Sequence, residues 1–136
     1  MVDKIAEVKI DSIMTSDVYK YDESTTVRMA MDTLVQKGIS GAPLVDAKGR
    51  LLTIVSEFDL MQLGALGKMD EKLIDVESRF KPRDELLTCM KIDTFKDVFK
   101  IFLQNRIRRI VVIDNSDIVQ GVVSRRDIIR TFLDQN

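Results

Sequence analysis

The sequence contains no histidine and only one cysteine, and these absences narrow the chemistry open to the chain. Without histidine, the chain alone cannot form Cys–His or Ser–His–Asp nucleophile pairs, use an imidazole as general acid or base, or build a histidine-containing zinc site. The single cysteine, Cys89, has no second thiol for an internal disulfide. We therefore expect a protein that is not an enzyme and holds no metal.

Long hydrophobic runs are also missing. The longest apolar runs, such as residues 110–113, are far shorter than the ~20 residues of a membrane-spanning helix. The N-terminal stretch MVDKIAEVKI carries charges where a signal peptide needs an apolar segment. These features predict no membrane partner and a cytoplasmic location.

The chain has no excess of charge of either sign. Its 21 basic and 22 acidic residues give a net charge of −1, and only 6% of its residues are aromatic. No global field attracts nucleic acid, so any anion site must be local. With 136 residues and 45% hydrophobic content, the chain can form one compact domain or two small interlocked ones, burying about two thirds of its unfolded surface.

What the sequence does contain is a repeat with an offset of 68 residues. Residues 18–61 align with residues 86–129 without a gap. Seven identities fall in this alignment: Thr26/Thr94, Gln36/Gln104, Ile39/Ile107, Asp46/Asp114, Val55/Val123, Ser56/Ser124 and Asp59/Asp127. The chain is therefore interpreted as one unit written twice.

The pattern of apolar residues supports the repeat more strongly than the identities do. The first copy has the i, i+3, i+4, i+7, i+8 spacing of a helix that buries one face. The residues are Val27, Ala30, Met31, Leu34 and Val35, and the same offset gives Phe95, Val98, Phe99, Phe102 and Leu103. The same buried helix face is predicted in both copies.

Each copy is predicted to run strand, helix, strand, strand, helix. Thr26 and Thr94 are expected to cap the first helix, and Ser56 and Ser124 the last one. The expected strands are 18–21, 44–45 and 51–55 in the first copy and 86–89, 111–113 and 118–123 in the second, with turns at 46–49 and 114–117 and closing helices at 57–66 and 125–133. We interpret residues 1–66 as repeat 1 (core 13–66), 67–85 as a connection with a short helical segment around 70–76, and 86–136 as repeat 2.

This order of motifs resembles a tandem pair of cystathionine-beta-synthase-type (CBS) domains, often called a Bateman module. The resemblance is carried by Ile13-Met14-Thr15, by the segment 40–46 (SGAPLVD), and by Ser-x-x-Asp near the end of each copy. It implies a fold of the α/β (α+β) class in which two pseudo-symmetric β-α-β-β-α repeats pack sheet to sheet. It also implies regulatory, energy-sensing modules that bind adenosine-containing ligands in clefts between the repeats.

Two departures from the family pattern predict that the two clefts differ. The family usually has glycine two residues before the hydrophobic-Ser/Thr step, and the first copy has Thr53 where the second has Gly121. We therefore expect tighter backbone approach in the first cleft. The second copy has Val111 where the first has Pro43, and its nearest match to the Ile-Met motif is Asp75-Val76.

A nucleotide needs partners for its base, ribose and phosphate. By the resemblance, the Asp59 and Asp127 carboxylates would accept hydrogen bonds from the ribose hydroxyls, while Ser56 and Ser124 offer hydroxyls and N–H groups at a helix start that favours anions. Strand edges would read the base through backbone groups. The predicted ligand-binding residues are Val18, Ser40, Gly41, Ala42, Pro43, Ser56, Asp59, Thr94, Ile107, Arg108, Arg109, Ile110, Ser124, Arg126 and Asp127. The alternative for each Ser-x-x-Asp is an ordinary helix cap, and the two roles are compatible.

Arginine is concentrated in the second copy. Six arginines stand there where the first copy has other residues: Arg106, Arg108, Arg109, Arg125, Arg126 and Arg130. Nucleotide-binding members of the family often place a basic pair at Arg108-Arg109, and guanidinium groups bind phosphate in bidentate fashion. The alternatives are ion pairs with Asp114 and Asp117 and, less favoured, a nucleic-acid surface.

The leading expectation is a module without a cofactor that binds AMP, ADP or ATP and signals occupancy to an unknown regulated protein. S-adenosylmethionine is an alternative ligand, because its base and ribose would be read alike. A homodimer is expected through the helices carrying Leu60/Met61 and Ile128/Ile129, unless these side chains are simply core. The alternative function is a dimerisation or interaction module with no physiological small ligand.

Overall fold

The computed structural model describes residues 3–134, and the outer ends of the two expected repeats, residues 1–2 and 135–136, lie outside the described residues. The chain forms two compact units. One contains Tyr19–Leu86, and the other combines Met1–Val18 with Leu87–Asn136. We call them the central unit and the terminal unit, and each is described by itself.

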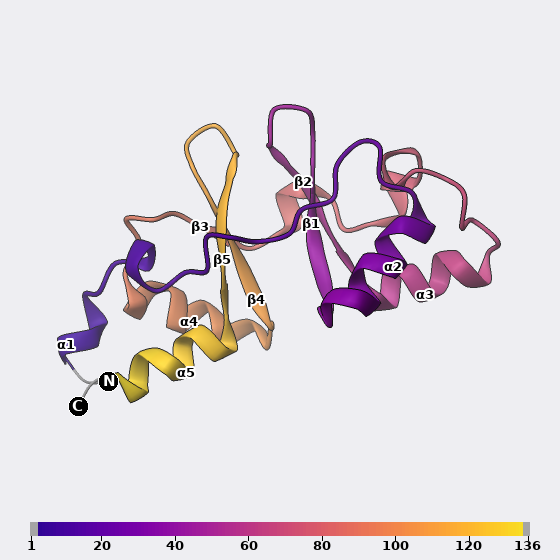
Figure 1. The fold of residues 1–136 in the computed structure, drawn as a ribbon. Helices are drawn as coiled ribbons and strands as arrows, with labels where there is room; N and C mark the ends of the chain where they lie inside the picture. The colour runs from indigo at the N-terminus through magenta and orange to yellow at the C-terminus, as the bar shows by residue number, and fades with distance from the viewer. Residues whose placement is uncertain (1–2, 135–136) are drawn as a thin grey trace. The chain divides into compact units, whose positions relative to one another are not determined.

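The central unit holds a two-stranded antiparallel sheet with helices beside it. Its elements in order are α2 (Val27–Lys37), β1 (Gly41–Val45), β2 (Leu51–Ser56), α3 (Glu57–Ala65) and the 3-10 helices η2 (Leu73–Arg79) and η3 (Arg83–Glu85). Helices α2 and α3 lie side by side (Figure 1). The short helical segment expected around residues 70–76 is present, three residues later, as η2.

The terminal unit repeats this arrangement with one more strand. Its elements are α1 (Asp3–Ala6), the 3-10 helix η1 (Ile10–Ser12), β3 (Thr88–Cys89), α4 (Phe95–Asn105), β4 (Arg109–Ile113), β5 (Val119–Ser124) and α5 (Arg125–Leu133). Strand β3 pairs with β4 in parallel and β4 pairs with β5 antiparallel. Mixed helix and strand content confirms the predicted fold class.

The threonine caps predicted for the first helix of each copy are present. The Thr26 hydroxyl accepts a hydrogen bond from the Met29 N–H at 3.1 Å, and the Thr94 hydroxyl accepts one from the Asp97 N–H at 3.3 Å. The Asp97 carboxylate bonds back to the Thr94 N–H and hydroxyl, which completes a capping box. These bonds from Thr94 hold the pKa of Asp97 below its usual value.

The two sheets share their irregularities at the same offset. The register of β1 and β2 shifts between Leu44 and Val45, and that of β4 and β5 shifts between Val112 and Ile113. Both hairpin turns are closed by an aspartate, Asp46 or Asp114, which accepts bonds from backbone N–H groups two and four residues further on. The 68-residue repeat therefore extends to turn and bulge geometry.

The expected first strands form only in part. In the second copy, β3 covers two of the four predicted residues, 88 and 89. In the first copy, Tyr21 makes a single parallel bridge to Leu44, with its N–H donating to the Pro43 carbonyl at 2.8 Å. Tyr21 is nevertheless fully buried, so this segment contributes mainly to the core.

Each unit has its own hydrophobic core, and each core is completed by a segment that precedes the other repeat in sequence. In the terminal unit, Ile5 and Ile10 from the N-terminal segment are fully buried beside Phe95 and Val98. In the central unit, the segment after α3 supplies side chains buried to 5% exposure or less. These are Leu73, Val76 and Phe80.

Backbone hydrogen bonds fix these segments in place. The Ile10 N–H donates to the Asp93 carbonyl at 2.8 Å, and the Phe95 N–H donates to Val8 at 2.7 Å. In the central unit, the Val27 N–H donates to Glu71 at 2.9 Å. The boundaries of the compact units therefore differ from those of the sequence repeats. The segment before the first repeat is buried in the terminal unit, and the segment before the second repeat is buried in the central unit.

We predict that Ile10→Ala destabilises the terminal unit by about 2–5 kcal/mol, because it leaves a cavity at a fully buried position. Urea unfolding gives the change in free energy, and hydrogen exchange locates it: amides of residues 87–134 should exchange faster than in the wild type. Val35→Ala, at a side chain 78% exposed, is the control and should change stability by less than ~0.5 kcal/mol. Faster exchange confined to residues 19–86 would contradict the assignment of this segment.

Cys89 is predicted to be chemically inert in the folded protein. Its side chain is buried, and burial, aided by the nearby Asp93 charge, raises the pKa of the thiol to about 12. Because the thiolate is the reactive form, labelling by a disulfide reagent at pH 8 should be slow until a denaturant unfolds the chain. Labelling of the native protein at the rate of a free thiol would show that the core opens around Cys89.

Candidate functional site

The closing helix of each unit begins with the same serine–aspartate capping box. The Asp59 Oδ2 accepts hydrogen bonds from the Ser56 N–H and hydroxyl, both at 2.9 Å. The Asp127 Oδ2 accepts the same pair from Ser124 at 2.8 and 3.0 Å. In return, each serine hydroxyl accepts the aspartate N–H at 3.2 Å. The predicted caps are confirmed, and each places a carboxylate on the first turn of its helix.

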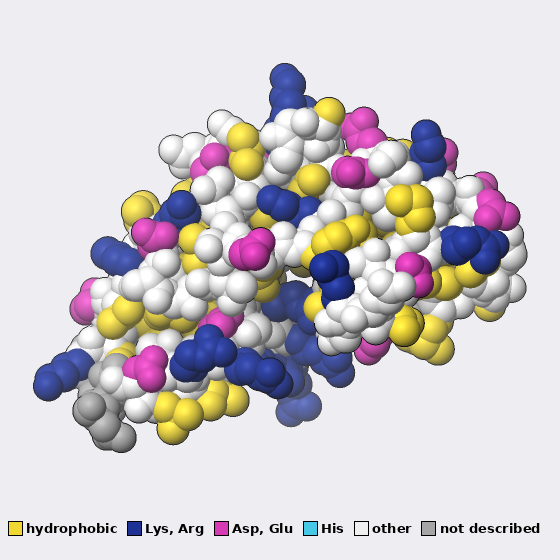
Figure 2. Space-filling view, viewed as in Figure 1, with side chains coloured by type: hydrophobic (Ala, Val, Ile, Leu, Met, Phe, Trp, Pro, Cys, Tyr) yellow, Lys and Arg dark blue, Asp and Glu magenta, His cyan; other side chains and the backbone are white. Residues whose placement is uncertain are grey.

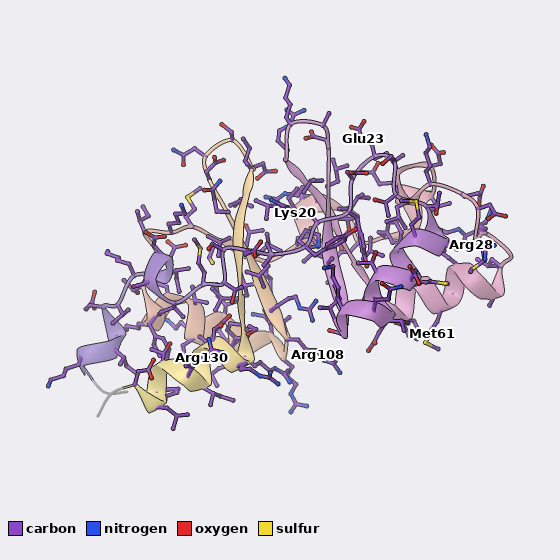
Figure 3. All side chains as sticks on the ribbon, in the orientation of Figure 1. Lys20, Glu23, Arg28, Met61, Arg108 and Arg130 are labelled. Atoms are coloured by element: carbon purple, nitrogen blue, oxygen red, sulfur yellow. The ribbon has the colours of Figure 1, made fainter. Side chains whose placement is uncertain are left out.

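Asp127 uses both carboxylate oxygens inside the terminal unit. Its Oδ1 accepts a hydrogen bond from the Arg130 Nη1 at 3.0 Å and a longer one from the Thr15 hydroxyl at 3.4 Å. The residue is only 4% exposed. A buried carboxylate with a cationic partner and several donors is well satisfied, so a ligand would have to replace some of these bonds. Arg130 lies along α5 (Figure 3).

Asp59 is more open than Asp127. It is half-buried, and its Oδ1 accepts no hydrogen bond from residues 3–134. It lines a pocket of about 310 Å³ inside the central unit. The pocket wall consists of Asp59, Gln62, Leu63, Leu66, Ser78, Arg79 and Phe80. One repeat therefore presents an available carboxylate oxygen, whereas the other has both oxygens engaged.

Gly121 and Thr53 explain part of this difference. In the terminal unit, Thr15 bridges to Val122 through two backbone hydrogen bonds of 2.9 Å. A Cβ atom at Gly121 would lie 2.6 Å from the Thr15 carbonyl oxygen, so only glycine allows this segment to cross β5 so closely. In the central unit, the Thr53 hydroxyl instead donates to the Lys81 carbonyl at 2.8 Å. The expectation of tighter approach at Thr53 is wrong, because the closest backbone contact is at Gly121.

Several predicted base-reading residues lie in the interior of their own unit. Ala42, Pro43 and Ile110 are buried within β1 and β4, where their side chains belong to the sheets' covered faces. Gly41 pairs with Ser56 and Arg109 pairs with Ser124 across the hairpins. At Gly41, Ala42, Pro43 and Ile110 only backbone groups are candidates for ligand contact, in line with the expected backbone reading, whereas the half-buried Arg109 also offers its guanidinium.

The start of each closing helix is tied to the residue before the first hairpin strand. The Glu57 N–H donates to the Ser40 carbonyl at 2.9 Å, and the Arg125 N–H donates to Arg108 at 3.1 Å. These carbonyls are therefore occupied within their units. Thr94 is likewise engaged in its capping box. The structure thus gives Thr94 a helix-capping role, and its ligand contact stays a prediction.

The arginines of the second copy differ in exposure and role. Arg108 and Arg126 are exposed and Arg109 is half-buried, and Figure 2 shows Lys and Arg side chains gathered over α5. The Arg125 guanidinium donates to the Ile107 carbonyl at 2.8 Å and to the Arg106 carbonyl at 3.1 Å. It closes the turn in which Arg106 has a left-handed backbone (φ 50°) where the first repeat has Gly38. One arginine of this set is therefore structural.

Comparison with known proteins identifies the family. The sequence model described as "CBS domain" matches residues 10–65 and again residues 75–134. The chain belongs to the CBS-domain family. It carries two CBS domains in tandem, as the sequence motifs indicated.

Relatives of known structure share the fold of the CBS pair. CBSX2 of Arabidopsis thaliana, solved in complex with AMP, is 24% identical with a TM-score of 0.77, over 93% of this chain and 97% of that one. The CBS domain pair of protein MJ0100, in complex with 5′-methylthioadenosine and S-adenosyl-L-methionine, is 20% identical with a TM-score of 0.76, over 95% and 98%. At this level of identity, both show the fold.

A relative in sequence is longer than this chain. An uncharacterized protein of Methanocaldococcus jannaschii is 26% identical over 129 residues, which cover 95% of this chain and 41% of the relative. The chain therefore spans less than half the length of that relative.

The helices expected to form a dimer face present only half of the predicted residues outward. Met61 is 68% exposed and Ile129 is 59% exposed, and Figure 3 shows Met61 on the outer side of α3. Leu60 and Ile128 are instead buried in the cores of the two units. These two side chains are core, which was the stated alternative, and the homodimer itself stays a prediction.

Residues missing from the predicted site line the pocket beside Asp59. Gln62 stands one helical turn after Asp59, so the i, i+3 spacing could have identified it. Ser78, Arg79 and Phe80 carry no such signal, because they reach the pocket from the connection. Two other residues of the predicted ligand site, Val18 and Ile107, are half-buried and belong to the terminal unit.

The described part of the chain shows neither of two other kinds of site. Among residues 3–134, no group of three histidine, cysteine, aspartate or glutamate side chains could hold a metal ion. Over the same residues, no helix has the length and apolar character needed to cross a membrane.

We predict that Gly121→Ala destabilises the second CBS domain by about 1–3 kcal/mol, because the new methyl group meets the Thr15 backbone and the chain must shift. Gly64→Ala in α3 is the matched control: its methyl meets only the flexible side chains of Met31 and Met69, and alanine favours helix. Urea unfolding should show a loss for the first variant and none for the second. Equal stability of Gly121→Ala and the wild type would contradict the close crossing.

Proposed function

We propose that this CBS pair is a non-catalytic regulatory module that binds an adenosine compound, with the Asp59 carboxylate accepting hydrogen bonds from the ribose hydroxyls. The observation that carries the proposal is the Asp59 side chain, held rigidly by Ser56 while its Oδ1 remains available beside a pocket. A vicinal diol can supply the two donors that this acceptor lacks. The ligand complexes of CBSX2 and MJ0100 support an adenosine ligand.

The preferred ligands are AMP, ADP or ATP. The second CBS domain has cations of its own, the exposed Arg108 and Arg126 and the half-buried Arg109, which would bind the phosphate of a ligand held by that domain. S-adenosylmethionine remains the alternative, supported by the ligands of MJ0100. We keep Ser40, Gly41 and Ile107 as proposed ligand contacts, made by their backbone groups or by the exposed part of their side chains.

Occupancy would regulate a partner protein through linkage. A ligand shifts an equilibrium only by the difference between its affinities for two states of the protein. The same proposal includes an unidentified regulated protein as the partner and a cytoplasmic location. A homodimer through the outward faces of α3 and α5, which expose Met61 and Ile129, would present two such modules together.

A dimerisation module without a small ligand is the second candidate, favoured by the exposed apolar side chains of α3 and α5. These are Phe58, Met61, Leu66, Ile129, Phe132 and Leu133. Such a module would show a dimer that survives dilution in sedimentation and no thermal shift with any adenosine compound.

Calorimetric titration with AMP tests the proposal. Asp59→Asn should weaken AMP binding at least ~10-fold, because a charged acceptor of the ribose is lost. Asp70→Asn, whose side chain is 87% exposed in a surface ion pair with Arg28, removes the same charge and should leave affinity unchanged. AMP bound equally by wild type and Asp59→Asn would remove the proposed site.

A further inference from the structure

The pocket beside Asp59 has two walls of different origin. One wall consists of Asp59, Gln62 and Leu63 of α3 and of Leu66, the residue directly after the helix, at the i, i+3, i+4, i+7 spacing. The opposite wall is the connection at Ser78, Arg79 and Phe80, where η2 ends. The pocket therefore joins the closing helix of the first CBS domain to residues near the start of the second matched segment, 75–134.

The connection is anchored on both sides of Arg79. Val76 and Phe80 are both 5% exposed and belong to the core of the central unit. One residue further on, the Lys81 carbonyl accepts the 2.8 Å hydrogen bond from Thr53. Ser78 and Arg79 are exposed between these anchors. The backbone that carries Arg79 is thus fixed at the pocket rim, while its side chain faces solvent.

Arg79 has no carboxylate partner within the described residues 3–134. It forms no ion pair with Asp59, although both line the same pocket. The pocket therefore carries an acceptor at Asp59 and a separate cation at Arg79, above the apolar Leu63 and Phe80. A ligand complementary to all of these groups has hydroxyl donors, an apolar portion and an anionic group.

We propose that Arg79 binds the anionic group of the ligand in this pocket, so that the first CBS domain selects an anionic nucleoside derivative over the uncharged nucleoside. This inference rests on the proposed function, because it assigns the ribose to Asp59. The pocket volume of about 310 Å³ lies at the lower end of the range for small-ligand sites, roughly 300–1,000 Å³. Arg79 then makes the connection itself part of the ligand site.

Calorimetric titration with two ligands, AMP and adenosine, tests the role of Arg79. Arg79→Gln should weaken AMP binding about 10-fold or more while changing adenosine binding less than about twofold, since adenosine lacks the anion. Wild-type affinity for AMP should fall as salt is raised, and this dependence should be smaller in Arg79→Gln. Arg28→Gln, at another exposed arginine of the central unit, is the control and should affect neither ligand.

The outcomes separate this inference from the function on which it rests. If Asp59→Asn weakens AMP binding and Arg79→Gln does not, the adenosine site stands and the role of Arg79 is overturned. The role of Arg79 is also overturned if Arg79→Gln weakens the binding of AMP and of adenosine equally. If wild type binds neither ligand, both proposals fail. Ribose 5-phosphate, as a third ligand, should lose affinity in Arg79→Gln as AMP does if the phosphate is the group recognised.

Discussion

The serine–aspartate capping box is the interaction on which both halves of this protein depend. In each unit the last strand passes directly into the closing helix, with Ser56 or Ser124 ending the strand and the next residue beginning the helix. So abrupt a change leaves the first N–H groups of the helix without helical partners. The box satisfies the aspartate N–H, and the carbonyl of Ser40 or Arg108 accepts the first helical N–H. The same bonds fix a carboxylate on the first turn. The stability of the junction and the position of the acidic group therefore have one cause.

Identical boxes nevertheless produce different surroundings, because the segments that cross the neighbouring strands differ. Gly121 admits the backbone of residue 15, which brings its hydroxyl to Asp127. Thr53 occupies that space in the first repeat and holds the Lys81 carbonyl through its side chain instead. The two repeats thus differ at Thr53 and Gly121, and their aspartates differ as well. Asp127 is fully hydrogen-bonded within its unit, whereas Asp59 borders a pocket.

Local features could be predicted from sequence because they depend on residues close together in the chain. The caps at Thr26 and Thr94, the aspartate turns and the strand order all follow from local hydrogen bonding and periodicity. The division of the closing helices was harder to predict, because the i, i+3, i+4 spacing allows neighbours such as Leu60 and Met61 on one face, and only the packing shows that Leu60 is buried and Met61 exposed. Other features required the fold, since nothing local indicates that Ile10 completes the terminal core or that Arg79 reaches the pocket.

The connection has two roles that ligand binding would join. Its Val76 and Phe80 side chains fill the core of the central unit, and Arg79 lines the pocket between them. Under the proposed function, a ligand held by both Asp59 and Arg79 would stabilise the folded central unit, by about 2.7 kcal/mol at a concentration 100 times its Kd. The chain runs on from the connection into β3, which pairs with β4 of the terminal unit. Because the same segment carries core side chains and a proposed ligand contact, ligand binding and the stability of the central unit would be linked.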